Sequence, residues 1–371
     1  MSDRKLIWLA AEISVAALWV RFGSGAALAL AMALPLIVLV SIPLNLYLRK
    51  KVQFRLTAEP NLRKGTAGYV NLELENPTHL PVNPVFTLTI RNLLNGAVCR
   101  EKIRFTGGSM NLEIKSDHCG RLRVTVEKAK LYDCFGLIGI RLNCREKCHI
   151  TVQPDGFETS ITLADPPGGL AESEQYSQYR PGTDMTETFQ LREYVPGDSP
   201  RQIHWKLSGK LDRLIVRDPG LPIIQDVLLF WERTSPEETP QSIDAQAEVI
   251  VSIARQMLEE DVQFRLGWND TQENRCILHD IRELDDLIAV LPRLLSASGS
   301  GDSDSGAALL MQTRPDALCS HMVYVASTPA AEVLDWNGYG RLTVLSASDG
   351  YDGAVRFDEI NYPSQLASLV F

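Results

Sequence analysis

The longest uncharged stretch of the chain lies near its N-terminus and constrains the fold most. No charged side chain occurs between Phe22 and Leu48, and this stretch includes the apolar run from Ala26 to Val40. A helix that crosses a bilayer needs about 20 predominantly apolar residues, so the segment is long enough to span a membrane. Pro35 lies inside the run and predicts a kink in the helix.

A shorter apolar run precedes this stretch and carries one acid, Glu12. The glycines between Arg21 and Gly25 suit a tight reversal of the chain. Residues 1–50 are therefore predicted to form a transmembrane helical hairpin, with helices at about 6–20 and 26–48. We expect Glu12 to lie shallow or to face the second helix, because an isolated intramembrane acid is costly. A single span, with the first run lying along the membrane interface, is the alternative.

The charges that flank the apolar runs predict an orientation. Arg4 and Lys5 precede the first run, four further basic residues follow the second between positions 49 and 55, and Arg21 lies in the turn. The positive-inside rule then places both ends of the hairpin in the cytoplasm. Seven cysteines, an odd number without framework spacing, agree with a cytoplasmic body at the inner membrane. A cleaved signal peptide is disfavoured, because cleavage here leaves a long apolar stub on the mature chain.

The overall charge argues against a nucleic-acid partner. The 371 residues include 37 Lys and Arg and 46 Asp and Glu, for a formal net charge of −9. Nucleic-acid binders usually carry a basic excess or a dense basic face, and neither is clear in this sequence.

Residues 52–152 show the two-residue period of β-strands. Apolar and polar residues alternate around 70–74, 86–90 and 122–126, and turn sequences such as Asn95-Gly96 separate these runs. Several short strands at this spacing predict an all-β, sandwich-like domain.

Cysteines and histidines gather in the same region and raise the question of a zinc site. They are His118, Cys119, Cys134, Cys144, Cys148 and His149. No Cys-x-x-Cys pair occurs among them, so the spacing fits neither a zinc ribbon nor a finger. Cys144 and Cys148 share the parity of apolar neighbours and are predicted to face the core. We therefore expect no metal site here.

The segment 153–220 is the most informative part of the sequence. The turn sequence Val195-Pro-Gly-Asp198 lies among charged residues of both signs. One interpretation is a recognition surface, or an acid/base site that uses Glu193 and Asp198. The other is a salt-linked loop that locks a turn against a domain seam and buries Trp205. No nucleophile–base set is recognisable, so structure or docking is favoured over catalysis. The candidate docking residues are Arg192, Tyr194, Pro196, Gly197, Asp198, Arg201, Trp205 and Lys206.

The sequence between residues 191 and 217 also resembles that of a known protein family. The stretch Leu191-Arg-Glu-Tyr-Val-Pro-Gly-Asp-Ser-Pro-Arg-Gln-Ile-His-Trp-Lys206, followed by Leu214-Ile-Val-Arg217, resembles the signature of the bacterial domain-of-unknown-function family fifty-eight. Asp133-Cys-Phe-Gly-Leu137 resembles the sequence that precedes this signature in many members. The chain has His204 where the family usually has Asp, and Ser208-Gly-Lys where it usually has Ala-Arg-Thr.

The resemblance implies a membrane-anchored protein without established enzymatic activity. Members are typically encoded beside a MoxR-type AAA+ ATPase, and transglutaminase-like membrane proteins are common neighbours. Their C-terminal part resembles a von Willebrand factor A domain. A MoxR-type AAA+ ATPase and a transglutaminase-like membrane protein are therefore the partners that the resemblance implies.

Residues 221–371 alternate between strand-like and helix-like patterns. The continuous apolar run 227–231 is typical of a buried parallel strand, and residues 250–258 and 284–295 follow helical spacing. Ser242 or Asp244 is predicted to cap the first of these helices, and Pro292 to bend the second. The alternation predicts an α/β domain with a parallel sheet, which the resemblance identifies as a degenerate von Willebrand A-like domain.

The resemblance also raises the question of a metal at the end of the first strand. An A domain normally binds Mg²⁺ there through Asp-x-Ser-x-Ser, and the equivalent stretch here runs from Phe230 to Ser235. Glu232, Thr234 and Ser235 supply oxygen ligands for a degenerate site, but Trp231 and Arg233 argue against it. We expect a metal-free domain that serves as a docking surface, with no cofactor.

Three functions follow from these observations. The favoured one is a non-enzymatic, membrane-anchored scaffold whose cytoplasmic body docks an AAA+ ATPase or envelope-associated partners. The second is a metal-dependent ligand-binding module of the A-domain type. The third is a hydrolase that uses Glu193 and Asp198.

Overall fold

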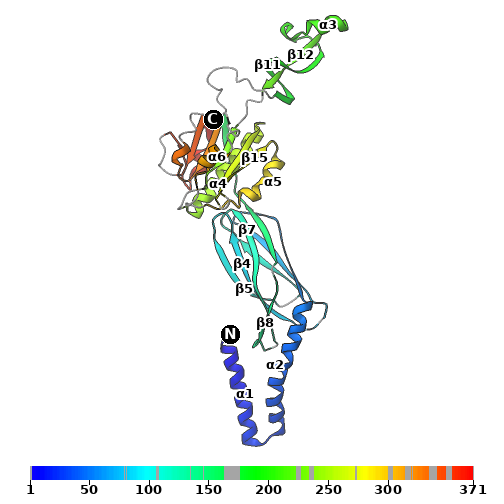
Figure 1. Cartoon of the computed structure of the whole chain (residues 1–371), viewed down its shortest axis with the longest axis vertical. Coiled ribbons are helices and arrows are strands. Elements are labelled where there is room, and N and C mark those ends of the chain that lie inside the picture. The colour runs from blue at the N-terminus through cyan, green and yellow to red at the C-terminus, as the bar shows by residue number, and fades with distance from the viewer. Residues whose placement is uncertain are drawn as a thin grey trace.

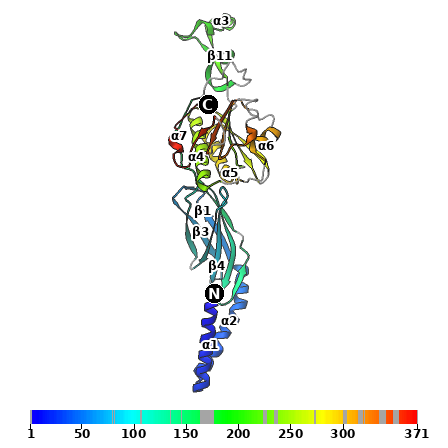
Figure 2. The same cartoon turned by 90° about the vertical axis from the view of Figure 1, so that its left-hand side faces the viewer.

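The computed structural model arranges the chain as a row of units along one axis. It describes residues 2–78, 80, 82–105, 108–133, 135–144, 146–162, 176–222, 227–233, 238–271, 274–299, 304–313, 319, 321–333, 341–347 and 353–370. Figures 1 and 2 show a helical hairpin at one end, then a β-rich region, an α/β region, and an arm formed by residues 176–222. The body is β-rich, and two of its sheets have six strands each.

The N-terminal hairpin consists of α1 (Ser2–Phe22) and α2 (Gly25–Lys51), which pack against each other. Gly23 adopts a left-handed φ of +60°, which lets two residues reverse the chain. The helices are longer than predicted, and Pro35 and Pro43 both lie inside a continuous α2. Glu12 is half-buried in line with Trp8 and Val15, at positions i, i+4 and i+7 of one helix face.

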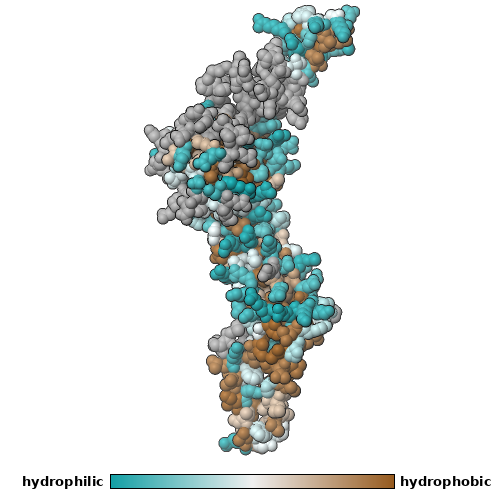
Figure 3. All heavy atoms as spheres, in the orientation of Figure 1, coloured by the Kyte–Doolittle hydropathy of each residue, from teal (hydrophilic) through white to brown (hydrophobic). Residues whose placement is uncertain are grey.

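Most apolar side chains of the hairpin face outward, as Figure 3 shows in brown. Val20, Phe22, Met32 and Leu39 each expose about two thirds of their surface or more. The structure has one helix, α2, that is long and apolar enough to cross a membrane; a signal sequence shares these properties. The first helix, predicted as a second span at 6–20, does not qualify by itself among the described residues.

The end of α2 is built into the next unit. Ser41, Asn45 and Leu48 are buried at spacings of four and three residues, and this end of the helix contacts β7 and β8. Leu48 is fully buried in the core of the β-rich region. The hairpin is therefore packed onto the body and is not joined to it by a free linker.

The β-rich region contains two sheets that share one hydrophobic core. One sheet has the order β1-β3-β6, and the other has the order β2-β9-β7-β4-β5, with β8 beside β7. Val70 and Leu72 of the first sheet and Phe86 and Val124 of the second belong to the same buried cluster. The strands are β1 (Gln53–Ala58), β2 (Asn61–Arg63), β3 (Ala67–Glu75), β4 (Asn83–Asn92), β5 (Val98–Arg104), β6 (Ser109–Lys115), β7 (Gly120–Tyr132), β8 (Gly139–Leu142) and β9 (Lys147–Gln153).

The α/β region is a mixed sheet of order β15-β14-β13-β16-β17-β18, with helices on both faces. Neighbours from β14 to β18 pair in parallel, whereas β15 pairs antiparallel with β14 at the edge. This antiparallel strand was missed by the sequence analysis. The elements are β13 (Val227–Trp231), α4 (Pro240–Glu259), β14 (Phe264–Asp270), β15 (Arg275–Ile281), α5 (Leu284–Leu294), α6 (Gly306–Thr313), β16 (His321–Ala326), β17 (Arg341–Ser346), β18 (Val355–Arg356) and α7 (Tyr362–Gln365).

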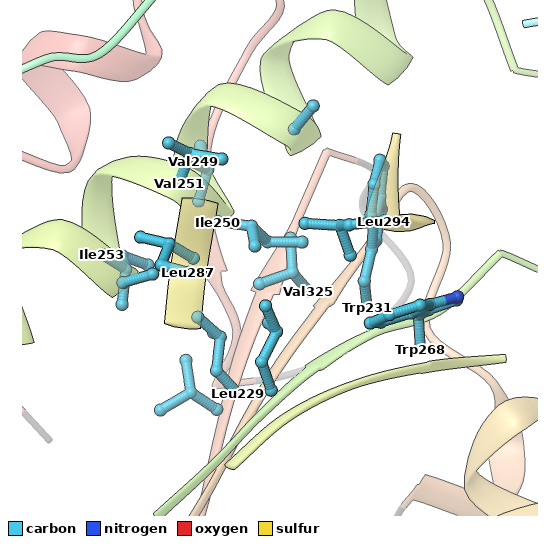
Figure 4. Packing of buried hydrophobic residues seen from close by; sticks show 14 of the residues in the cluster. Leu229, Trp231, Val249, Ile250, Val251, Ile253, Trp268, Leu287, Leu294 and Val325 are labelled. Atoms are coloured by element: carbon cyan, nitrogen blue, oxygen red, sulfur yellow. The ribbon is translucent and has the colours of Figure 1, made fainter. Parts of the chain in front are cut away.

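Alternate residues of β13 enter two different cores, because successive side chains of a strand point to opposite faces. Leu229 and Trp231 pack with α4 and α5, as Figure 4 shows, whereas Leu228 and Phe230 pack with α6. The continuous apolar run 227–231 thus reflects a strand covered on both faces.

The predicted N-cap of the first helix in the α/β region was wrong. Thr239, not Ser242 or Asp244, caps α4: its hydroxyl accepts a hydrogen bond from the Ser242 amide, and Pro240 occupies the first helical position. Pro292 lies inside α5, which continues to Leu294, and the bend at Pro292 stays a prediction. Ser242 and Asp244 are instead buried on α4, and Asp244 is used for a contact between regions.

Charged residues join the β-rich region to the α/β region. Lys64 pairs with Glu248 of α4 and lies 4.0 Å from Asp244, while His118 Nδ1 lies 2.8 Å from Asp244 Oδ2. The Cys119 amide donates to Asp244 Oδ1 at 2.9 Å. Burial alone lowers the pKa of Lys64. The hydrogen bond from Lys64 to Glu248 and the negative charges of Glu248, Asp244 and Asp155 together outweigh the burial and raise that pKa. The two regions are therefore held by a partly buried ionic seam.

Two short strands bring the segment after the β-rich region together with the C-terminal segment. β10 (Ser160–Thr162) pairs in parallel with β19 (Ser368–Val370), which brings the end of the β-rich region beside the C-terminus. The arm between them contains β11 (Tyr176–Glu193), η1 (Pro200–Gln202), α3 (Trp205–Leu211) and β12 (Ile215–Pro222).

Candidate functional site

The residues of the family-like signature form the tip of the arm. β11 and β12 pair antiparallel, with Arg192 opposite Val216 and Glu193 opposite Ile215. The connection between the two strands holds the Val195–Asp198 turn, η1 and α3. Figure 1 shows this tip at the far end of the molecule from the hairpin.

Arg192 is the centre of the arm's polar network. Its Nη1 and Nη2 donate to the two carboxylate oxygens of Asp198 at 2.7 and 2.8 Å. Its Nε lies 3.1 Å from both carboxylate oxygens of Asp218 on β12. One guanidinium thus ties the turn to both strands through paired, charge-assisted hydrogen bonds.

Asp198 closes its own turn, as the Val-Pro-Gly-Asp sequence predicts. Its carboxylate accepts the Val195 amide at 2.8 Å, and its amide donates to the Val195 carbonyl at 3.0 Å. Gly197 has a φ of +116°, a conformation that favours glycine. The hydrogen bonds from Arg192, and then from the Val195 amide, lower the pKa of Asp198 to about 2.

Two further polar side chains hold α3 against the strands. His204 caps the helix, with Nδ1 accepting the Leu207 amide at 3.2 Å, and its own amide donates to the Ile215 carbonyl. The buried Ser208 hydroxyl accepts the Ile215 amide at 2.9 Å. His204 and Ser208 are two of the positions where the chain departs from the signature that it resembles, and both side chains support the fold of the arm.

Trp205 is the clearest correction to the sequence analysis. The salt-linked interpretation predicted a buried Trp205 at a domain seam, whereas 66% of its surface is exposed at the start of α3. Seam contacts involve Lys64, His118 and Asp244 instead. The other part of that interpretation, a turn held by a salt link, agrees with the ion pair between Arg192 and Asp198.

Other apolar and basic side chains of the arm are also exposed. The exposed apolar residues are Leu191, Val195, Leu211 and Leu214. The exposed cations Arg201, Lys206 and Lys210 have no ion pair within the described residues, and Tyr194 is half-buried. Pro196 and Gly197 are exposed in the turn. At the tip, Arg192, Asp198 and Asp218 neutralise one another's charge, whereas apolar and basic side chains are exposed on the surface.

The structure does not bring Glu193 and Asp198 together as a pair of carboxylates. Asp198 is held by Arg192, whereas Glu193 pairs with Arg213 at 2.5 Å. The Glu193 and Arg213 side chains are both largely exposed. Arg213 and Asp218 were not predicted as partners of these residues, because the register of β11 with β12 decides which side chains lie opposite each other.

Glu232, the candidate metal ligand, is committed to other contacts. Its Oε2 accepts the Gly306 amide at 2.7 Å, the Ala307 amide at 3.3 Å and the Tyr324 hydroxyl at 3.0 Å. The carboxylate thus caps α6, where a negative charge is favourable. Thr234 and Ser235 lie outside the described residues.

The neighbouring Arg233 is fully buried and places a cation inside this end of the sheet. It pairs with Glu238 at 2.6 Å, donates to the carbonyls of Leu94 and Ala297, and lies 4.8 Å from the Trp231 ring centre. Within the described ranges, no three His, Cys, Asp or Glu side chains form a group that could hold a metal ion.

The cysteines and histidines of the β-rich region are spread over different sites. Cys144 and Cys148 pack against the hydrophobic core, which confirms the prediction from parity, and burial raises the pKa of Cys148 to about 11. Cys119 is buried at the seam, whereas His149 lies on the opposite face of the sheet from Cys148. Cys134 lies outside the described residues.

Comparison with known proteins identifies no family. No protein-family model matches the chain, and no curated protein matches it. Among solved structures, a cohesin module from a Clostridium perfringens family 33 glycoside hydrolase has a TM-score of 0.21 at 10% identity, over 27% of this chain and 96% of that one. The CARDB domain of a Pyrococcus furiosus protein has a TM-score of 0.19 at 11% identity, over 27% and 86%. A Listeria innocua beta-glucosidase has a TM-score of 0.18 at 11% identity, and the chain covers 16% of it.

Proposed function

We propose that the chain is a non-enzymatic, membrane-anchored scaffold of the domain-of-unknown-function family fifty-eight. Its cytoplasmic body presents the arm to a MoxR-type AAA+ ATPase. One observation carries this proposal. In the arm, the charged residues Arg192, Asp198 and Asp218 bind one another, whereas the side chain of Trp205 is exposed to solvent. These charged side chains stabilise the fold of the arm, and the exposed Trp205 side chain is free to contact a partner protein.

The hairpin supports the anchoring part of the proposal. A large exposed apolar surface on a folded protein marks a site that contacts a membrane or another protein. The outward side chains of α1 and α2 form such a surface around both helices. With Arg49, Lys50 and Lys51 in the last turn of α2, the positive-inside rule favours a cytoplasmic body.

The body supports the proposed domain types. Two sheets around one core fit a β-sandwich. In the α/β region, the central strand β13 is followed by β14 on one side and by β16 on the other. This order, 3-2-1-4-5-6 in strand sequence, is a doubly wound arrangement with a switch point between β13 and β16. It agrees with an A-like domain whose metal position is degenerate at Glu232.

The surface of the arm suggests the chemistry of its partner. Trp is strongly enriched among residues that dominate binding energy at interfaces, and basic residues around it favour an acidic partner surface. Arg201, Lys206 and Lys210 supply these charges. We therefore propose that Trp205 enters an apolar pocket that is rimmed by acidic residues on the ATPase.

Purification of the tagged full chain from detergent-solubilised membranes tests this function. The wild type should enrich an AAA+ ATPase, and Trp205→Ala should reduce the enrichment by at least about tenfold, as for loss of a binding hot spot. Tyr69→Ala is the matched control, because Tyr69 is an aromatic residue of β3 that is 51% exposed away from the arm. Failure of the wild type to enrich an ATPase, or equal loss in both variants, contradicts the proposal.

A C-terminal reporter fusion tests the orientation separately. A fluorescent protein that folds only in the cytoplasm should be active, and an alkaline phosphatase that needs the periplasm should be inactive. The reverse pattern contradicts a cytoplasmic body, whatever the arm binds.

A further inference from the structure

The outer face of the sheet β2-β9-β7-β4-β5 is strongly basic, although the chain as a whole is acidic. Apolar residues such as Phe86, Leu88 and Val124 point into the core, so their neighbours in sequence point outward. The outward cations of the paired strands are Arg63, Arg91, Arg100, Lys102, Arg104, Arg121, Arg123, Lys128, Lys130, Arg141 and Lys147. The described strands contribute one acid to this face, Glu127, which lies at a register shift and 3.7 Å from Arg100.

Cations on this face lie directly opposite each other on neighbouring strands. Lys130 of β7 faces Arg141 of β8, and Arg91 of β4 faces Arg123 of β7. Such like-charged pairs destabilise a sheet unless an anion lies near them. Burial and the charges of Arg121, Arg123 and Lys147 lower the pKa of His149 on the same face. The described strands of this face therefore carry a large excess of positive charge, which Glu127 reduces only beside Arg100.

One end of this face lies where the hairpin joins the body. Arg104, Val85, Lys130 and Arg141 occupy one row across four strands. The end of α2 contacts β7 and β8, the strands that carry Lys130 and Arg141, and α2 itself ends in three basic residues, Arg49, Lys50 and Lys51. Figure 3 shows hydrophilic residues directly next to the apolar hairpin at this junction.

We propose that this row, with Lys102 and Lys128 behind it, binds the headgroups of anionic membrane lipids. The inference rests on the proposed anchoring of α2 in the membrane, which brings the row to the headgroup level. Anionic lipids attract basic residues over about one Debye length, roughly 8 Å at physiological ionic strength. Arg91 and Arg123 lie about seven residues further along β7, or roughly 20 Å away, so they are beyond this range.

A second copy of the chain is a poor occupant for this surface. Copies anchored in one membrane hold their β-rich regions at the same height, so their basic faces meet as like charges. Anionic headgroups instead surround the anchor continuously and complement the charge of the row. The contact also fixes the body close to the bilayer, so that the seam at Lys64 and Glu248 holds the α/β region above it.

Hydrogen exchange of the full chain in lipid nanodiscs tests this inference. Nanodiscs of phosphatidylcholine alone are compared with nanodiscs that also contain phosphatidylglycerol. Phosphatidylglycerol should slow amide exchange in β8 and the adjoining end of β7 severalfold. Lys130→Gln with Arg141→Gln should raise the phosphatidylglycerol fraction needed for half of this effect by about tenfold or more, since each surface charge contributes about fivefold.

Arg91→Gln with Arg123→Gln is the matched control. It removes an opposed pair of cations from the same face at the other end of the strands, and it should leave the lipid effect unchanged. Equal losses in the two double variants, or no effect of phosphatidylglycerol on the wild type, overturn the inference. Equal protection by inorganic phosphate in phosphatidylcholine nanodiscs also overturns it, as does protection by a nucleic acid or polyglutamate but not by the lipid.

The hydrogen-exchange rates of α2 in the same nanodiscs test the proposed membrane anchoring independently of the lipid headgroups. Slow exchange of α2 in every nanodisc shows that the anchor is inserted, whatever the headgroups do. Rapid exchange of α2 in all lipids contradicts the anchoring itself.

Discussion

The guanidinium of Arg192 binds Asp198 through two parallel hydrogen bonds while its Nε contacts Asp218. A single arginine thereby joins a turn to the strand on the opposite side of the arm. Because these bonds need a planar group with several donors, a lysine, with one ammonium group, is a poor substitute for Arg192.

The first prediction concerns the titration of Asp198. Arg192→Gln should raise the pKa of Asp198 from about 2 toward its ordinary value, because its strongest stabilising partner is lost. Carboxyl-carbon NMR of the aspartate-labelled chain in detergent measures this. Arg213→Gln is the control, since Arg213 pairs with Glu193 and should leave Asp198 unchanged.

The same pKa determines how the arm responds to pH. The folded pKa of Asp198 lies below the value of an unfolded aspartate, about 3.9. The stabilisation from its ion pair is therefore fully present above about pH 4 and is lost as the pH falls through 2. An Asp198 pKa that remains near 2 in Arg192→Gln contradicts the assigned cause.

The second prediction distinguishes a residue that stabilises the arm, Ser208, from one that is exposed on its surface, Trp205. Ser208→Ala should destabilise residues 203–216 by about 1–3 kcal/mol, because the buried Ile215 amide loses its acceptor. Trp205→Ala should change the local stability by less than about 0.5 kcal/mol, because the side chain is largely exposed. Hydrogen exchange of the arm measures both. A large destabilisation by Trp205→Ala contradicts a role in contact alone.

The third prediction concerns the ionic seam. Lys64→Met should destabilise the chain by about 3 kcal/mol, because Glu248 and Asp244 then remain buried without this cation. Urea unfolding in detergent measures the change. Lys115→Met, which removes an exposed pair with Asp117, should cost less than about 1 kcal/mol.

The seam should also weaken in strong alkali. The pKa of Lys64 is raised in the folded chain, so its stabilisation is present at neutral pH and is lost as the pH rises through the folded pKa. Wild-type and Lys64→Met chains should therefore converge in stability at high pH. A constant difference between them excludes a charge effect.

The fourth prediction concerns the end of β13. Glu232→Ala should destabilise the α/β region by about 1–3 kcal/mol, because the Gly306 amide and the Tyr324 hydroxyl lose their shared acceptor. Magnesium should not raise the melting temperature of the wild type, since Glu232 already accepts three hydrogen bonds. A magnesium-dependent rise that disappears in Glu232→Ala supports the metal-dependent alternative. Glu259→Ala, at the exposed end of α4, is the control.

Patterns over a few residues were enough to predict several elements of this chain. The uncharged stretch 22–48 became α2, the alternation around 86–90 became β4, and the run 227–231 became a strand buried on both faces. Asp198 closes the turn that its sequence predicts. These features depend on helix and strand periodicity and on local turn chemistry, which act between near neighbours in the chain.

Contacts between distant segments required the folded structure. The alternation around 122–126 predicts a strand, but the register shift at Glu127 turns Lys130 outward, and the register of β7 with β8 places Arg141 opposite it. Likewise, packing placed Trp205 in solvent and Asp244 at a buried seam. The sequence by itself determined the helical hairpin, several strands and the turn, because local backbone preferences and apolar periodicity suffice for them. Tertiary structure alone decided the basic face, the seam and the exposed tip of the arm, because each depends on which strands and helices become neighbours in space.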